Sequence, residues 1–211
     1  MSVTTRRQTQ SGLTLTELMI TLAIAGLILG MFSLAWNTYL RKTQLSSMAQ
    51  RTMMTLQRAR LQSVYQGVNH FVVLDPDERL LQIYKDTSVP IGAFDNGDTL
   101  VSLDQWPESV RMELPTGATS VTNPVGSGEL TTAWSLPLPD TSGRWGTELR
   151  GLMMTPSGKV MSVEAAPEVV GLGTIVFNDN SGRAEAVSVS IEGRSGVVRG
   201  FRLQESAWKQ L

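Results

Sequence analysis

The sequence contains no cysteine and only one histidine, His70. Without cysteine there are no disulfide bonds, thiolate nucleophiles or cysteine-based zinc sites, and one histidine leaves almost no material for imidazole metal sites or histidine-dependent triads. We therefore predict no metal and no cofactor. No catalytic constellation is visible, so we expect the chain not to be an enzyme; a membrane-tethered envelope enzyme is an alternative that an activity screen would test.

Charge is also scarce. Charged residues make up 18% of the 211 residues, and the formal net charge is −1. Such a chain has no general basic field that would attract nucleic acid, so any DNA binding would need a local basic patch. The length suits one domain with an appendage.

The longest predominantly apolar run is residues 18–36, LMITLAIAGLILGMFSLAW, which contains no charged residue. As a helix, this run is long enough to cross roughly 30 Å of hydrocarbon. Arg6 and Arg7 precede it and favour a cytoplasmic N-terminus. A secretory signal would carry small residues at a cleavage site after the run, whereas here Ser11 and Gly12 stand before it. Removal of residues 1–12 would therefore leave the helix on the mature protein.

Glu17 lies at the start of this apolar helix, where an ionisable group needs a partner or a wet location. Two interpretations are open. The glutamate could lie at the interface and extend its carboxylate toward the lipid headgroups. Alternatively, it could be a docking charge that pairs with the α-amino group of a neighbouring chain, so that neither charge is isolated in lipid.

The stretch GLTLTELMI, residues 12–20, followed by Ala23 and Gly26, resembles the class III prepilin signal of type IV pilins and type II secretion pseudopilins. The resemblance implies that a prepilin peptidase cuts between Gly12 and Leu13 and methylates the new amino terminus. It also implies that Glu17 takes the place of the family's docking glutamate. Leu13 stands where phenylalanine is usual.

Beyond the membrane segment, apolar residues recur at three- and four-residue spacing, which predicts an amphipathic helix with one apolar stripe. We expect one helix from about Thr14 to Gln66, with Gly67 and Asn69 as stop signals. The predicted stripe consists of Leu45, Met48, Ala49, Thr52, Met53, Leu56, Ala59 and Val64.

The remaining sequence predicts short antiparallel strands separated by polar turns. The fold class is therefore α+β, with a long N-terminal helix packed on an antiparallel β-sheet head. We expect four parts: a leader (1–12), a transmembrane half of the helix (13–40), a periplasmic amphipathic half (41–67) and the head (68–211). The predicted strands are residues 70–74, 80–85, 110–114, 130–136, 149–155, 159–163, 174–178, 186–191 and 197–203.

Three finer expectations concern the head. Residues 88–106 and 115–128 show little periodicity and are expected to be exposed loops. In residues 186–191, Val187, Val189 and Ile191 alternate with Ser188 and Ser190, which predicts one packed face and one face in water. The acidic groups at residues 75–78 and 95–98 fit turn chemistry, with calcium binding as an alternative.

The order of long helix, an Arg58-Ala59-Arg60 segment with a glycine stop at Gly67, and a late hairpin at residues 173–183 is similar to the GspH/FimT group of minor pseudopilins. This resemblance implies a structural subunit of a type II secretion pseudopilus or a type IV pilus, acting in filament priming and protein export. Implied partners are other pilins or pseudopilins, the prepilin peptidase and an inner-membrane assembly platform. The implied location is a single-pass inner-membrane protein with a periplasmic head.

The alternative function is a DNA-binding minor pilin for natural transformation. Arg194, Arg199 and Arg202, with Phe201 and Trp208, are candidates for a cationic strip with a stacking surface for single-stranded DNA. Some members of the resembled family bind DNA through a C-terminal arginine motif. The competing interpretation is a solvated strand edge.

Overall fold

The structure is a computed structural model that describes residues 14–87, 94, 97–115, 117–125, 128–133, 150–162, 171–179, 185–204 and 207–211. The chain divides into two compact units, Met1–Leu40 and Arg41–Leu211.

One helix, α1, runs from Leu15 to Gln66. It ends where Gly67 adopts φ +70° and donates its amide to the Ser63 carbonyl at 3.0 Å. A left-handed residue of this kind is favourable for glycine and closes a helix C-terminus. The predicted limits of the helix are therefore confirmed.

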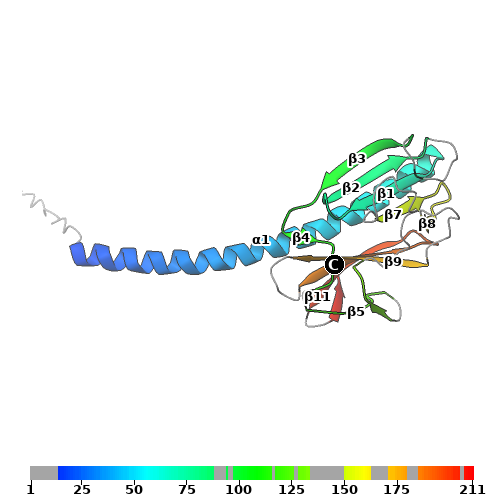
Figure 1. The fold of residues 1–211 in the computed structure, drawn as a ribbon. Helices are drawn as coiled ribbons and strands as arrows, with labels where there is room; N and C mark the ends of the chain where they lie inside the picture. The colour runs from blue at the N-terminus through cyan, green and yellow to red at the C-terminus, as the bar shows by residue number, and fades with distance from the viewer. Residues whose placement is uncertain are drawn as a thin grey trace, which may run out of the picture. The chain divides into compact units, whose positions relative to one another are not determined.

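The described strands form two five-stranded antiparallel sheets and a two-stranded ribbon, shown in Figure 1. Sheet A has the order β3-β2-β1-β7-β8, and sheet B the order β12-β11-β10-β9-β4. Strands β5 and β6 form the ribbon. The α+β prediction is confirmed.

The strands of sheet A are β1 (His70–Asp75), β2 (Leu80–Lys85), β3 (Thr99–Gln105), β7 (Arg150–Met154) and β8 (Val160–Ser162). Those of sheet B are β4 (Val110–Arg111), β9 (Leu172–Asp179), β10 (Ala186–Glu192), β11 (Val198–Gln204) and β12 (Ala207–Gln210), and the ribbon strands are β5 (Val121–Thr122) and β6 (Glu129–Leu130).

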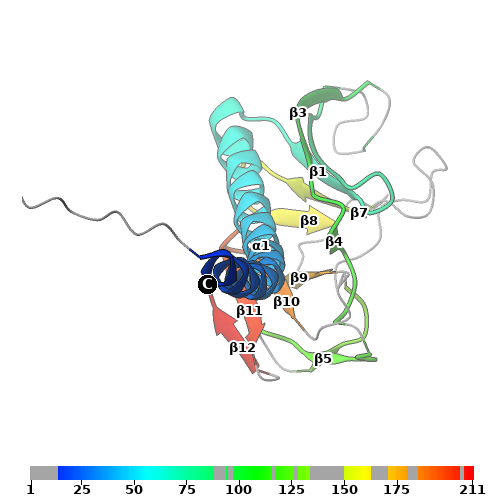
Figure 2. The ribbon, with the colours of Figure 1, turned by 90° about the vertical axis from the view of Figure 1, so that its left-hand side faces the viewer.

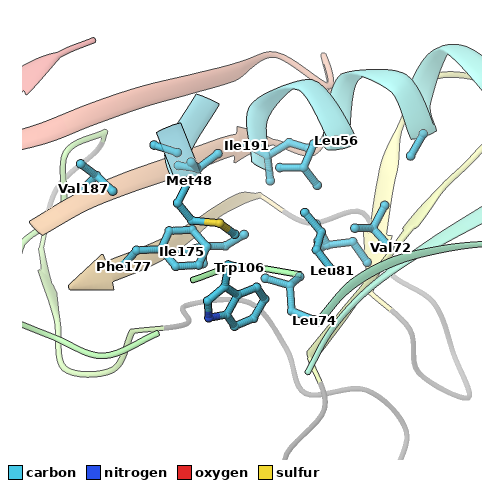
Figure 3. Packing of buried hydrophobic residues seen from close by; sticks show 14 of the residues in the cluster. Met48, Leu56, Val72, Leu74, Leu81, Trp106, Ile175, Phe177, Val187 and Ile191 are labelled. Carbon is cyan, nitrogen blue, oxygen red and sulfur yellow. The ribbon is translucent and has the colours of Figure 1, made fainter. Parts of the chain in front are cut away.

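The core joins residues 41–66 of α1 to both sheets (Figures 2 and 3). Met48 and Leu56 of the helix belong to the same buried cluster as Val72 of sheet A and Phe177 of sheet B. Full burial of one large apolar side chain stabilises a fold by roughly 1.5 to 3 kcal/mol. The helix is thus held by apolar contact with two sheets.

Most of the helix stripe is buried as predicted, but its last member is not. Val64 is 51% exposed, whereas its neighbour Ser63 is fully buried. The Ser63 hydroxyl lies 2.7 Å from the carbonyl oxygens of both Val68 and Met154. A polar side chain can take the buried place because its hydroxyl is hydrogen bonded there.

Seven predicted strands agree with observed strands to within two residues at each end. The strand predicted at residues 110–114 is shorter, because pairing of β4 with β9 covers only Val110 and Arg111. The strand predicted at residues 130–136 agrees with β6 at Leu130 and is wrong for residues 131–133, since β6 ends at Leu130. Residues 134–136 lie outside the described residues.

Both predicted loops, residues 88–106 and 115–128, are corrected in part by the structure; residues 88–93, 95–96, 116 and 126–127 lie outside the described residues. Residues 99–105 form β3, which pairs with β2, and Trp106 is only 3% exposed. The Trp106 ring lies 6.0 Å from the Phe177 ring, so this segment supplies a core residue. Residues 121–122 form β5. Strand β12 was not predicted from the sequence.

The expectation that the serine face of β10 meets water is wrong. Ser188 is fully buried, and Ser190 is 2% exposed. A second apolar cluster, which includes Leu130 and Val176, covers this face of sheet B. The Ser190 hydroxyl lies 3.1 Å from that of Thr174, which satisfies two polar groups away from water.

Candidate functional site

Glu17 lies in the first turn of α1, where it closes the helix start together with Thr14. The Glu17 carboxylate accepts hydrogen bonds from the Thr14 amide and the Thr14 hydroxyl, both at 2.9 Å. In return, the Glu17 amide donates to the Thr14 hydroxyl at 3.3 Å. This reciprocal arrangement is a capping box, and its sequence signature is a threonine followed three residues later by a glutamate. This role of Glu17 was not predicted from the sequence.

The apolar half of α1 leaves its large side chains uncovered. Leu22 is 64% exposed, Leu27 67% and Met31 72%, whereas Leu45 in the second half of the helix is 2% exposed. Among the described residues, α1 is the one helix long and apolar enough to cross a membrane, by length and composition. Thr21 is compatible with a hydrocarbon environment, because its hydroxyl donates to the Leu18 carbonyl at 2.8 Å and is therefore satisfied within the helix.

Two further features of this helix suit a lipid environment. Trp36 packs against Phe32 and Tyr39, with ring centroids 5.6 Å and 6.2 Å apart. Tryptophan and tyrosine favour the level at which hydrocarbon meets the headgroups. Gly26 and Gly30 form a G-x-x-x-G pair with open space where a Cβ would lie, which lets a second helix approach closely. This spacing was readable from the sequence but was not used.

Comparison with known proteins supports the N-terminal interpretation. A family model, the prokaryotic N-terminal methylation motif, matches residues 7–33. The match confirms the prepilin-type signal and covers Gly12, Leu13 and Glu17; Gly12 and Leu13 lie outside the described residues.

No curated protein matches the chain. Among solved structures, the chain is similar to the minor pseudopilin EpsH from the Type 2 Secretion System of Vibrio cholerae. That similarity has 12% sequence identity and a TM-score of 0.36, and it covers 80% of this chain and 96% of the other.

The three candidate arginines of the head do not form one surface. Arg194 lies in the turn between β10 and β11. Arg199 pairs with Ser190 and Arg202 with Val187, so their side chains leave opposite faces of sheet B. The expected stacking partners are also occupied. Phe201 is 8% exposed, and the Trp208 indole donates to the Thr122 carbonyl.

Arg60, from the segment that resembles minor pseudopilins, fastens the helix to two hairpin turns. Its Nε donates to the Gly158 carbonyl at 3.0 Å, in the turn between β7 and β8. Its side chain also lies against Gly196, in the turn between β10 and β11, where an added Cβ would lie 2.3 Å from Nε. Arg60 therefore links α1 to both sheets at once.

His70, the first residue of β1, is fully buried. Its Nδ1 lies 3.2 Å from the Val68 carbonyl, and its Nε2 has no hydrogen-bond partner among the described residues. Burial lowers the pKa of His70 below its usual value, and the positive charge of Lys85 lowers it further, against the opposing effects of Val68 and Asp86.

The acidic turn at residues 75–78 has a structural explanation. The Asp75 carboxylate accepts hydrogen bonds from the amides of Asp77 and Glu78, both at 3.0 Å. This is turn chemistry that an aspartate supplies without a metal. Asp95, from the second acidic group, lies outside the described residues, and Asp98 accepts a hydrogen bond from the Thr87 amide at 3.2 Å.

Proposed function

We propose that this chain is a minor pseudopilin or minor pilin of the GspH/FimT type, a structural subunit of a type II secretion pseudopilus or a type IV pilus. One observation carries the proposal: a methylation motif over residues 7–33 leads into a helix that continues without a break from Leu15 to Gln66. A cleaved secretory signal would be separate from the folded head. Here the apolar segment and the core of the head share one helix.

In the proposed mechanism, a prepilin peptidase cuts between Gly12 and Leu13 and methylates the new amino terminus. The apolar half of the helix stays with the mature protein and holds it in the inner membrane, with the N-terminus cytoplasmic and the head periplasmic. During assembly, the exposed apolar side chains pack against the helices of other pilins. Gly26 and Gly30 would allow the closest approach.

Glu17 is the proposed assembly residue. Thr14 gives its carboxylate two hydrogen bonds, but no positive charge lies among these contacts. In lipid, such a carboxylate remains costly until a positive charge lies near it. The amino terminus of a neighbouring subunit would supply that charge, so the charge would favour contact between subunits.

Three substitutions separate the charge of Glu17 from its capping role. Glu17→Gln keeps side-chain hydrogen bonding at the third helical position but removes the charge, since both residues occur in capping boxes. Thr14→Val removes the two hydrogen bonds of the Thr14 hydroxyl but keeps the charge of Glu17 and its bond to the backbone amide of residue 14. Glu17→Ala removes both.

Incorporation into filaments, measured by cross-linking to a partner pilin in the envelope, is expected to fail for Glu17→Gln and Glu17→Ala and to persist for Thr14→Val. All three variants are expected to insert in the membrane. Normal incorporation of Glu17→Gln would contradict the docking role, and loss in Thr14→Val alone would assign Glu17 to the helix cap.

The proposed role is structural, in filament priming and protein export, with an inner-membrane assembly platform as a further partner. DNA uptake is the less supported function, since Arg199 and Arg202 on opposite faces of sheet B give a single strand no continuous basic track. A gel-shift assay with the purified protein tests this alternative. A shift that is lost in Arg199→Ala plus Arg202→Ala would restore it.

A further inference from the structure

The chain itself marks the level at which the helix leaves the membrane. Trp36 and Tyr39 lie at the end of the apolar run, and Arg41 and Lys42 follow directly. Two residues span at most about 7 Å of extended chain, so Lys42 lies close to Leu40 however the two units are arranged. If the anchor lies in a membrane, as the proposed function requires, Arg41 and Lys42 lie at headgroup depth.

Two contacts join sheet B to Lys42, the residue placed at headgroup depth. The Arg202 guanidinium lies 3.5 Å from the Lys42 carbonyl oxygen and donates to it. The Lys42 ammonium pairs with Glu185 at 2.9 Å, just before β10. These two contacts hold the end of β11 and the start of β10 beside the first turn of the amphipathic half of the helix.

Lys209 adds a second positive charge next to Arg202. The two residues are direct partners across β11 and β12, and so project from the same face of sheet B. Like charges directly opposite each other destabilise a strand pair. No acidic side chain among the described residues forms an ion pair with Lys209 or Arg41. An anion placed between Arg202 and Lys209 would relieve this repulsion.

Space for such an anion exists beside Arg202. Lys42, Glu185 and Arg202 line a cavity of about 320 Å³, together with Leu45, Ala186, Leu203 and Gln204. A guanidinium recognises phosphate through paired hydrogen bonds, and an ammonium adds a point charge. Glu185 is already paired with Lys42, and no acidic side chain among the described residues forms an ion pair with Arg202, so the cavity wall carries an excess of positive charge.

We propose that Arg41, Lys42, Arg202 and Lys209, here called the basic cluster, bind the phosphate groups of anionic phospholipids. The head then rests on the membrane surface until it is taken into a filament. A lipid phosphate is favoured over a free phosphate because the adjoining anchor keeps the cluster beside a dense layer of headgroups, which gives a high effective concentration. The cluster is also open, since Arg41, Lys42 and Lys209 are exposed.

The test uses the full chain in lipid nanodiscs. Because the protein has no cysteine, Gln210→Cys provides a single labelling site on β12. Energy transfer from a dye at this position to an acceptor on the lipid headgroups reports how closely the head approaches the membrane. We expect higher transfer in nanodiscs that contain phosphatidylglycerol than in nanodiscs of phosphatidylcholine alone. The difference should vanish at about 1 M salt, where the Debye length is about 3 Å.

Substitutions then locate the site. Arg202→Gln plus Lys209→Gln is expected to lower the ratio of docked to undocked heads about fivefold for each charge removed. Arg58→Gln plus Arg194→Gln is the charge-matched control, because both residues are exposed and neither belongs to the basic cluster. The control should retain the response to phosphatidylglycerol.

Equal transfer in the two kinds of nanodisc, or an equal loss in the control, would overturn the inference. Loss of docking in inorganic phosphate, but not in chloride of equal ionic strength, would also overturn it, since the cluster would then prefer a free phosphate. Failure of the chain to enter nanodiscs would instead count against the proposed membrane anchor. Insertion without any dependence on anionic lipid would leave the anchor intact.

Discussion

Replacing Gly196 with alanine tests how Arg60 fastens α1 to the two sheets. Gly196 has φ +65°, and a Cβ there would lie 2.3 Å from the Arg60 Nε and 2.8 Å from the Gly158 carbonyl oxygen. The left-handed backbone alone costs alanine about 1 to 2 kcal/mol. The contact with a backbone oxygen cannot be relieved by a side-chain rotation, so overpacking adds roughly 1 to 3 kcal/mol. We therefore expect Gly196→Ala to lower the free energy of unfolding by about 2 to 5 kcal/mol.

Two other glycines provide matched controls. Gly117 has φ +82° with nothing within 4 Å of an added Cβ, so Gly117→Ala should show the backbone cost alone. Gly158 has φ +78°, and its Cβ would first meet the flexible end of the Arg60 side chain at 3.3 Å. Gly158→Ala should therefore fall between the other two.

The assay is denaturant unfolding of the full chain in mild detergent, followed by tryptophan fluorescence. Trp106 is buried in the core and reports its loss. Adding Arg60→Ala to Gly196→Ala should recover only part of the stability, because the Gly158 oxygen remains in the way. If Gly196→Ala were as stable as Gly117→Ala, the proposed close packing of Gly196 against Arg60 and the Gly158 oxygen would be refuted.

Further substitutions test the core and its response to pH. Leu56→Ala, at a fully buried position of α1, should lower the free energy of unfolding by roughly 2 to 5 kcal/mol. Tyr65→Ala, at a side chain that is 92% exposed, should change the free energy of unfolding by less than about 0.5 kcal/mol. Similar losses in the two variants would contradict the assigned burial. The lowered pKa of His70 means that the unfolded chain binds a proton more readily, so stability should fall as the pH drops below about 6.5, by up to about 1.4 kcal/mol per pH unit. The unfolding free energy of His70→Gln should lack this part of the pH dependence, and an unchanged slope would show that His70 does not cause it.

The helix and most strands could be predicted from the sequence because their signals are local. Apolar spacing and Gly67 mark the body and the end of α1, and valine alternation marks β10. The capping box was equally local, since Thr14 and Glu17 stand three residues apart, and it was missed only because Glu17 was considered as a charge alone.

The features that could not be predicted depend on segments distant in the chain. Arg60 meets Gly158 across 98 residues, and nothing near Arg60 indicates that contact. The burial of Ser188 depends on a cover that includes Leu130. The pairing of β3 with β2 shifts register between Leu100 and Ser102, so Leu100 and Leu103 lie on the same face, opposite Tyr84 and Gln82. Both leucines are exposed, and the sequence of β3 therefore shows no regular alternation of apolar and polar residues. Its pairing with β2 defines it as a strand.

The placement of the two arginines of β11 was also not predicted correctly from the sequence. Sequence spacing suggested one basic strip, but residues three apart on a strand point to opposite faces. Arg202 instead lies beside Lys42, which is 160 residues away in the chain. This long-range contact, and not the local arginine motif, led to the proposed lipid-binding cluster.

The most direct test of the central claim is the intact mass of the protein extracted from the bacterial envelope. We expect a chain that begins at Leu13, carries one added methyl group and retains the whole of α1. A native protein that begins beyond residue 36, released as a free head, would contradict it.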